Sequence, residues 1–257
     1  MSWKNTLKYL ARSRSIGFAQ ALNPHAQAQV QQLAYHGKPV YFRAGTSDPH
    51  LVYGILLKTG AKAEYVFPAN FRPQVILDIG ANIGISATLF AERFPAATIH
   101  AIEPVDSNFD MLKRNAELRP SIHPHQLALA DKDGTMEMMR SDNERNFGGF
   151  SFYSAGSQAA ERFSVATATP SSFLQSVGVK TVDMIKIDTE GAEYPILTAF
   201  DPEMLAKVTW ITGELHGEKD FEVLAYLSQW FDIELKKRFK KRLFIFRACN
   251  KNALHLI

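Results

Sequence analysis

Two short runs of charged residues hold the side chains best suited to acid–base chemistry. In the first run, Lys186 and Asp188 alternate with apolar residues, and Glu190 follows. In the second run, Glu214 and His216 have the same spacing. Residues two positions apart share one face of a β-strand. Because carboxylate and imidazole groups are common general bases, the pattern predicts a proton-transfer site at the ends of two strands.

A lysine in an otherwise apolar strand needs an opposite charge nearby, because an unpaired buried charge is very costly. Asp188 is the expected partner of Lys186, and this pair would hold Asp188 ionised and directed at a substrate. A purely structural ion pair is the alternative. Glu214 would raise the basicity of His216, with a water-facing strand end as the alternative. We expect Asp188 or His216 to be the base, with Lys186 and Glu214 in positioning roles.

The same side chains are also potential ligands of a divalent ion. Asp188, Glu190, Glu214 and His216 offer oxygen and nitrogen ligands that suit Mg²⁺ or a similar ion. The sequence does not fix the distances between these groups. We therefore expect a site without a metal and keep a divalent ion as the alternative.

A glycine-containing turn farther upstream predicts a cofactor site. The segment 78–84 reads Asp-Ile-Gly-Ala-Asn-Ile-Gly and connects an apolar strand to a helix. A second apolar strand follows and leads directly into Glu103. Such a β-α-β unit binds a nucleoside-bearing cofactor at the carboxyl edge of a parallel sheet. An ordinary strand-turn-helix with two incidental acids is the alternative.

The details of this turn indicate which cofactor to expect. A dinucleotide site would need the pattern G-x-G-x-x-G, but Asn82 and Ile85 stand at the second and third glycine positions. Glu103 is placed to accept hydrogen bonds from two ribose hydroxyls. An acid-bearing edge suits the sulfonium and ammonium charges of S-adenosylmethionine and repels a pyrophosphate. We expect the chain to bind S-adenosylmethionine and S-adenosylhomocysteine but not NAD.

The composition restricts the remaining function classes. The chain has 257 residues with 46% apolar residues, which is enough for one large domain or one domain with an extension. A net charge of +3 and a single cysteine, Cys249, give no sign of a nucleic-acid partner or a disulfide framework. No apolar run approaches the ~18 residues that span a bilayer. We expect a cytoplasmic protein without a membrane span that acts on a small-molecule acceptor, with a homo-oligomer compatible with the sequence.

The N-terminal region differs in charge from the rest of the chain. No acidic residue precedes Asp48. The basic residues of this region are Lys4, Lys8, Arg12, Arg14, Lys38 and Arg43. A helical appendage is the favoured interpretation, and an organelle transit peptide is the alternative.

The order of expected elements indicates an α/β fold with a mainly parallel sheet. We expect an N-terminal extension at 1–72 and a cofactor-binding domain at 73–257. Strands are expected at 40–43, 75–79, 98–102, 122–130, 135–139, 182–188, 207–215, 231–236 and 243–248. Helices are expected at 1–35 with a break near 23, and at 49–57, 85–94, 104–118, 171–176, 194–200 and 221–230. We expect a hairpin turn at 131–134, an irregular segment at 141–164 and a basic turn at 236–242.

Several of these segments together resemble the FkbM family of S-adenosylmethionine-dependent methyltransferases. The resemblance covers roughly residues 40–248, and its most specific part is the segment 185–193, Ile-Lys-Ile-Asp-Thr-Glu-Gly-Ala-Glu. The other matching segments are 78–84, Glu103-Pro104 with Asn108, Leu112 and Asn115, 128–134, 43–48 and 64–65. The resemblance implies a Rossmann-like class I methyltransferase fold, with a mainly parallel seven-stranded sheet and an antiparallel C-terminal hairpin.

The resemblance also implies roles for particular residues. The residues expected at the cofactor are Asp78, Gly80, Ala81, Asn82, Gly84, Glu103, Pro104, Asn108, Ala130, Asp131 and Asp188. The segment 186–193 would face the reaction centre. The family mostly methylates hydroxyl oxygens of sugars and natural products, so O-methylation is the expected reaction. One departure is the segment 169–172, which lacks two acids common in the family. The alternatives are N- or C-methylation, a cofactor-binding module without catalysis, and an NAD-dependent oxidoreductase.

Overall fold

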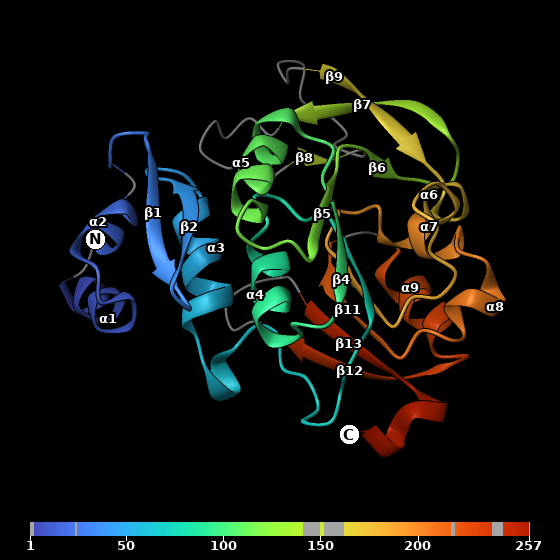
Figure 1. The fold of residues 1–257 in the computed structure, drawn as a ribbon. Helices are drawn as coiled ribbons and strands as arrows, with labels where there is room; N and C mark the ends of the chain where they lie inside the picture. The colour runs from blue at the N-terminus through green and yellow to red at the C-terminus, as the bar shows by residue number, and fades with distance from the viewer. Residues whose placement is uncertain are drawn as a thin grey trace.

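A computed structural model describes residues 3–23, 25–140, 150–151, 162–216, 219–237 and 244–256 of the chain. The fold is built around one large sheet with helices on both faces, and an N-terminal extension lies outside the helices of one face (Figure 1). In the described residues, no helix is long and apolar enough to cross a membrane.

The large sheet has seven strands in the order β12-β13-β11-β10-β3-β4-β5. Their bounds are β3 (Val75–Ile79), β4 (Thr98–Ile102), β5 (Ile122–His125), β10 (Met184–Ile187), β11 (Trp210–Leu215), β12 (Phe231–Lys237) and β13 (Phe244–Asn250). Strands β5, β4, β3, β10 and β11 pair in parallel, and β13 pairs antiparallel with both β11 and β12. The mainly parallel sheet and the antiparallel C-terminal hairpin are thereby confirmed, with β13 inserted between β11 and β12.

Helices bury both faces of this sheet. The helices beside the sheet are α4 (Ile85–Arg93), α5 (Asp106–Ala116), α6 (Pro170–Ser176), α7 (Glu193–Thr198), α8 (Pro202–Leu205) and α9 (Asp220–Leu227). Ile76 and Met184 pack with α4 and α5, whereas Leu77 and Ile185 pack with α6 and α7. This alternation explains why the strands read as continuous apolar runs, as expected for a parallel sheet buried on both faces.

A second, four-stranded sheet was not expected from the sequence. It has the order β6-β9-β7-β8, with β6 (Ala128–Leu129), β7 (Gly134–Arg140), β8 (Phe150–Ser151) and β9 (Arg162–Ala168). The single strand expected at 122–130 is therefore divided between two sheets. The expected hairpin turn at 131–134 is also wrong, because β9 lies between β6 and β7 and pairs with both.

Other expectations for these connections fall partly outside the described residues. Of the irregular segment expected at 141–164, residues 141–149 and 152–161 are not described, while 162–164 belong to β9. Residues 238–242 of the basic turn expected at 236–242 are likewise outside the described residues, while 236–237 belong to β12.

The N-terminal extension is helical only in part. It contains α1 (Trp3–Ser13), α2 (Ile16–Ala21), β1 (Val30–Tyr35), β2 (Lys38–Arg43), α3 (Asp48–Val52), a π-helix at Tyr53–Leu57 and a 3₁₀ turn at Gly60–Lys62. The helix expected across residues 27–35 is wrong, because β1 pairs antiparallel with β2. His36 and Gly37 have φ values of 48° and 78°. Two left-handed residues form the tight turn that suits a two-residue hairpin.

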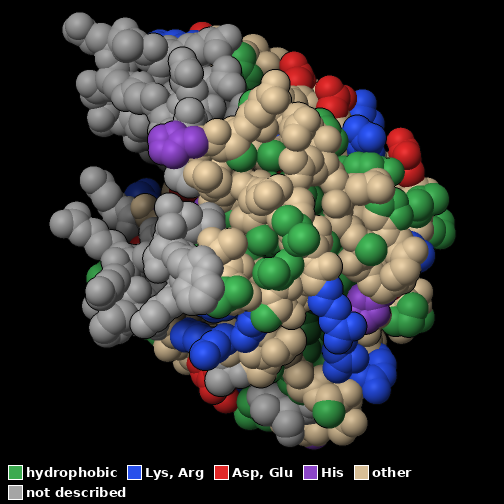
Figure 2. Space-filling model, turned by 90° about the vertical axis from the view of Figure 1, so that its left-hand side faces the viewer, with side chains coloured by type: hydrophobic (Ala, Val, Ile, Leu, Met, Phe, Trp, Pro, Cys, Tyr) green, Lys and Arg blue, Asp and Glu red, His purple; other side chains and the backbone are tan. Residues whose placement is uncertain are grey.

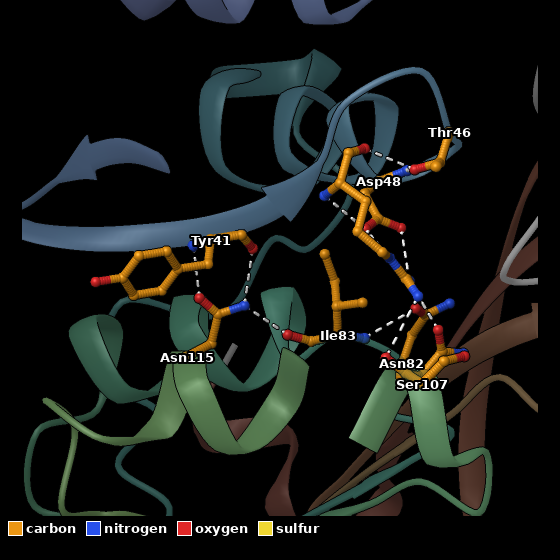
Figure 3. Close-up of polar contacts among 9 residues, drawn as sticks. Tyr41, Thr46, Asp48, Asn82, Ile83, Ser107 and Asn115 are labelled. Carbon is orange, nitrogen blue, oxygen red and sulfur yellow. Dashed lines mark hydrogen bonds and ion pairs between the residues drawn. The ribbon is translucent and has the colours of Figure 1, made fainter. Parts of the chain in front are cut away.

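The extension packs directly on the turn that follows β3. Phe42 and Val40 of β2 share an apolar cluster with Ile83 and Met111. The Asn115 side chain joins the two regions, because its Nδ2 donates to the carbonyls of Tyr41 (3.0 Å) and Ile83 (2.7 Å) (Figure 3). Its Oδ1 accepts from the Tyr41 amide at 2.7 Å. The extension and the turn are therefore held together by apolar packing and by three hydrogen bonds of the Asn115 side-chain amide.

Candidate active site

A cavity of about 1050 Å³ lies between the N-terminal extension and the carboxyl ends of β3, β4, β10 and β11. Ligands of open α/β sheets bind at this edge. The expected site residues that line the cavity are Gly80, Ala81, Asn82, Glu103, Pro104, Asn108, Lys186, Asp188, Glu190, Glu214 and His216. The structure therefore brings both charged runs and the glycine turn to one cavity. Asp78, Gly84, Ala130 and Asp131 are not among the lining residues.

The glycine turn depends on backbone shapes that few residues adopt. Gly80 has a φ of 73°, and a Cβ atom there would lie 2.0 Å from the Asp188 carbonyl oxygen. Gly84 has a φ of 82°, and a Cβ atom would lie 2.6 Å from Leu112 Cδ1. Asn82 is also left-handed at 52°, and its Oδ1 accepts from the next amide at 2.8 Å. The turn is thus fitted closely between the end of β10 and helix α5.

Glu103 connects the end of β4 to this turn. Its Oε2 accepts from the Asn82 amide at 2.8 Å, and its Oε1 accepts from the Val105 amide at 3.0 Å. Burial raises the pKa of Glu103 to about 7, although these amides and Asn108 act in the opposite direction. A carboxylate has about four lone-pair positions. Glu103 therefore keeps acceptor capacity for a ligand while the amides fix its orientation.

A bidentate ion pair in the N-terminal extension holds Asn108 beside Glu103. Arg43 donates to both carboxylate oxygens of the fully buried Asp48, at 2.7 Å and 3.0 Å. The same guanidinium donates to Asn108 Oδ1 at 2.8 Å and to the Ser107 carbonyl at 3.3 Å (Figure 3). Bidentate arginine–carboxylate pairs fix geometry as well as charge. The extension therefore helps to shape the end of the cavity beside Glu103.

Lys186 pairs with Asp78 rather than with the expected Asp188. Lys186 Nζ lies 3.2 Å from Asp78 Oδ1 and donates to the Gly80 carbonyl at 2.6 Å. The two residues are direct neighbours in the parallel pairing of β10 and β3. Neighbouring strands lie ~4.8 Å apart, whereas residues two apart along a strand are separated by about 6.6 Å. The cross-strand partner is therefore closer, and Asp188 acts on Lys186 at longer range.

His216 sits at the centre of four carboxylates. Its Nε2 lies 3.3 Å from Glu214, 3.7 Å from Asp188 and 3.9 Å from Glu190. Its Nδ1 lies 3.3 Å from Glu193. Burial alone would lower the pKa of His216, but the contacts with Glu193 and Glu214 and the nearby acids raise it to about 11. The imidazole is therefore protonated at neutral pH.

The carboxylates around His216 differ in protonation. Burial raises the pKa of Asp188, with Lys186 acting in the opposite direction. Burial also raises the pKa of Glu190 to about 7. Burial tends to raise the pKa of Glu193 as well, but hydrogen bonding to His216 outweighs it and leaves this pKa lowered. Beside the His216 cation, Glu193 is therefore firmly ionised, whereas Asp188 and Glu190 hold protons more tightly than usual.

Glu193 is the member of this cluster that the two runs of alternating charges did not single out. It begins α7, is buried, and accepts from the amides of Thr189 (2.9 Å) and Gly191 (3.0 Å). It thereby fixes the loop that carries Glu190. One ligand atom each from Asp188, Glu193 and His216 lie within 4.8 Å of one another. A divalent ion would therefore draw on Glu193, which the sequence-based ligand set did not include.

The strand order and the cavity define the class of the protein. Strand order β12-β13-β11-β10-β3-β4-β5 with β13 antiparallel, a glycine turn after β3 and an acid after β4 define a class I methyltransferase domain. A family model described as the methyltransferase FkbM domain matches residues 78–249, which is more than half of the chain. The chain belongs to this family.

Relatives of the chain are distant. It is 27% identical to Methyltransferase 1 of Beauveria bassiana over 56% of this chain and 65% of that protein. The chain thus spans just under two thirds of that relative's length. It is 23% identical to the 31-O-demethyl-FK506 methyltransferase FkbM of Streptomyces tacrolimicus, over 57% of this chain and 67% of that protein.

Among solved structures, the fold is similar to precorrin-6y C5,15-methyltransferase from Geobacter metallireducens. The TM-score is 0.44 with 13% identity, over 69% of this chain and 80% of that chain. The family assignment rests on the match to residues 78–249 and on the strand order.

Proposed function

We propose that this chain transfers the methyl group of S-adenosylmethionine to a hydroxyl oxygen of a small-molecule acceptor. Glu103 carries the cofactor assignment, since it is a buried acid beside a left-handed glycine turn at the carboxyl edge of the sheet. The acids that line the same cavity suit a ligand with sulfonium and ammonium charges. Bound S-adenosylmethionine supplies a methyl group that is already activated for transfer.

The protein's own part in the reaction is to orient the acceptor and to remove its proton. His216 is protonated at neutral pH and has no free lone pair, so it cannot accept that proton. Asp188 lies at the cavity with a raised pKa and one open side towards solvent, with its side chain 32% exposed. We therefore assign the base to Asp188. His216 and Glu214 hold its position, and Lys186 favours its ionised form against the effect of burial.

Binding and turnover test this proposal separately. In calorimetric titrations, S-adenosylhomocysteine should bind and NAD should give no heat of binding. Screening hydroxylated small molecules with methyl-labelled S-adenosylmethionine should then identify an acceptor that gains label on oxygen. Binding of NAD without binding of S-adenosylhomocysteine contradicts the cofactor assignment. Label found only on nitrogen or carbon contradicts O-methylation.

A further inference from the structure

Three cations converge on one tyrosine in the cavity wall that the N-terminal extension forms. Lys8 Nζ lies 5.6 Å from the centre of the Tyr53 ring, Lys58 Nζ lies 5.9 Å from it, and the Arg12 guanidinium carbon lies 6.0 Å from it. All four side chains line the cavity. They come from α1 and from the π-helix and its end, so distant parts of the extension meet here.

The Tyr53 hydroxyl is buried without a partner. The residue is 5% exposed, and its Oη has no hydrogen-bond partner. Its ring packs edge-on against Tyr9 with a centroid distance of 4.7 Å. A buried hydroxyl normally finds a partner, because leaving it unpaired forfeits its hydration. The residue lines the cavity, so a ligand that displaces the side chains covering this oxygen would supply the missing partner.

Contacts between the cations and the ring do not by themselves explain this arrangement. Cation–π attraction extends to about 6 Å, and all three distances lie close to that limit. Like charges gathered around one ring also repel one another. Arg12 is further tied in place by donation to the Leu57 carbonyl at 2.7 Å. Lys58 also interacts with a group other than the ring, so the need for an anion rests on Lys8 and Arg12. An anionic group beside these two residues would offset their repulsion and could also accept from the Tyr53 hydroxyl.

The cavity is divided by charge. At the strand ends, the wall has four acids, Glu103, Asp188, Glu190 and Glu214, together with Lys186, Lys236 and His216. The extension contributes four cations, Lys8, Arg12, Lys58 and Lys62, and one acid, Glu64. Figure 2, which shows the face on the extension's side of the molecule, has two groups of Lys and Arg side chains in its lower half and a further one at its upper right. The acidic end suits the cofactor, so the basic end remains for a ligand of opposite character.

We propose that the methyl acceptor carries a multiply charged phosphate or diphosphate group, which is held by Lys8, Arg12, Lys58 and the Tyr53 hydroxyl. This inference rests on the proposed methyltransferase function, because it assigns the acidic end of the same cavity to the cofactor. It gives the acid-free N-terminal region a role in substrate recognition.

Inorganic pyrophosphate is a suitable probe for this site. We expect one molecule to bind per chain at low ionic strength, in calorimetry on the full chain saturated with S-adenosylhomocysteine. The double substitution Lys8→Gln with Arg12→Gln should weaken this binding by about tenfold or more, the range for lost hydrogen bonds to a charged group. The matched control, Lys113→Gln with Lys132→Gln, removes two exposed charges outside the cavity lining and should bind like the wild type.

Tyr53→Phe separates ligand binding from folding. Removing an unpaired buried hydroxyl should leave the thermal stability unchanged or raise it, while pyrophosphate binding weakens. Unchanged pyrophosphate affinity in Tyr53→Phe and in the double variant overturns the proposal, as does equal affinity of the wild type for the dicarboxylate malonate. Weaker binding of S-adenosylhomocysteine by the double variant, with pyrophosphate binding retained, would instead assign the cations to the cofactor's carboxylate. Titration of the wild type with S-adenosylhomocysteine alone tests the methyltransferase proposal independently.

Discussion

Lys186 and Asp78 face each other across the junction of β10 and β3, with 3.2 Å between Nζ and Oδ1. Both are buried, and Asp78 also accepts from the Ser86 hydroxyl at 2.6 Å. This pair ties the central strands together directly beneath the glycine turn, because Lys186 also donates to the Gly80 carbonyl. It leaves Asp188 available for chemistry at the cavity.

Asp78→Asn should therefore destabilise the protein strongly. It leaves the Lys186 charge buried without its closest partner, and breaking a buried pair in this way costs about 3–5 kcal/mol. Asp188→Asn leaves that pair intact and should cost much less. Chemical denaturation of the two variants and the wild type, at one pH, measures both effects. Equal losses of unfolding free energy would show that Lys186 depends on both acids to the same degree.

Asp188→Asn should instead act on turnover. If Asp188 removes the acceptor proton, methyl transfer should fall by about 10²–10⁴-fold, the usual contribution of a general base. Affinity for S-adenosylhomocysteine should stay close to that of the wild type. Near wild-type turnover in the folded variant would leave Asp188 with a structural role only.

Treatment of the wild type with a chelator distinguishes a base from a metal ligand at the same residue. Activity that survives chelation supports the base, because a base needs no ion. Activity that is lost and then restored by Mg²⁺ would assign Asp188, Glu193 and His216 to a metal site, since these three groups offer ligand atoms within 4.8 Å.

Much of the large sheet could be predicted from the sequence because its strands are buried on both faces. Each central strand is a short apolar run that ends in a polar group. This pattern can be recognised in a single strand, without knowing which strands pair with it. The second sheet could not be predicted in this way. β9 lies between β6 and β7 in this sheet. Turn residues indicate only that two consecutive strands can pair, and they do not indicate that a later strand is inserted between them.

In the N-terminal extension, the helix expected across residues 27–35 was wrong for a different reason. The glutamine- and alanine-rich segment before Tyr35 has a high intrinsic helix propensity, yet pairing with β2 makes it a strand. The sequence signal for the hairpin was the glycine at 37, which follows His36. Both residues are left-handed in the structure. This helix propensity was overridden by a tight turn and by apolar packing of Leu33 and Val40.

At the candidate site, the residue types could be predicted but their partners could not. Lys186 was expected to pair along its own strand, and its actual partner depends on the register between β10 and β3. His216 was expected to have one carboxylate neighbour and has four. The fourth, Glu193, belongs to the segment that resembles the FkbM family, but no spacing rule places it against a histidine 23 residues away.

The protonated state of His216 predicts how stability depends on pH. Its pKa is about 11 in the folded protein and about 6.5 in an unfolded chain. The folded state therefore binds the extra proton, so this stabilisation is complete below pH 6.5 and is lost as the pH rises towards 11. Between pH 7.5 and 9, the unfolding free energy should fall by up to about 1.4 kcal/mol per pH unit from this group. His216→Gln should flatten that slope in denaturation experiments, and a variant with an unchanged slope would place the titration elsewhere.

The role of Glu103 in cofactor binding can be tested with a control that the structure itself supplies. Glu103→Gln keeps the size of the side chain and removes its charge, so affinity for S-adenosylhomocysteine should fall by about 1.5–3 kcal/mol, the range for hydrogen bonds to a charged group. Asp131→Asn is the matched control. It changes an acid that was also expected at the cofactor but that the structure places outside the cavity lining.

Calorimetry should show weaker binding by Glu103→Gln and unchanged binding by Asp131→Asn. Because Glu103 also accepts from the amides of Asn82 and Val105, its substitution disturbs the turn as well as the charge. Thermal unfolding of the ligand-free variant separates these effects, since a loss of affinity without a lower melting temperature points to direct contact with the ligand. Loss of affinity in Asp131→Asn alone would place the cofactor against the loop after β6 instead of at the end of β4.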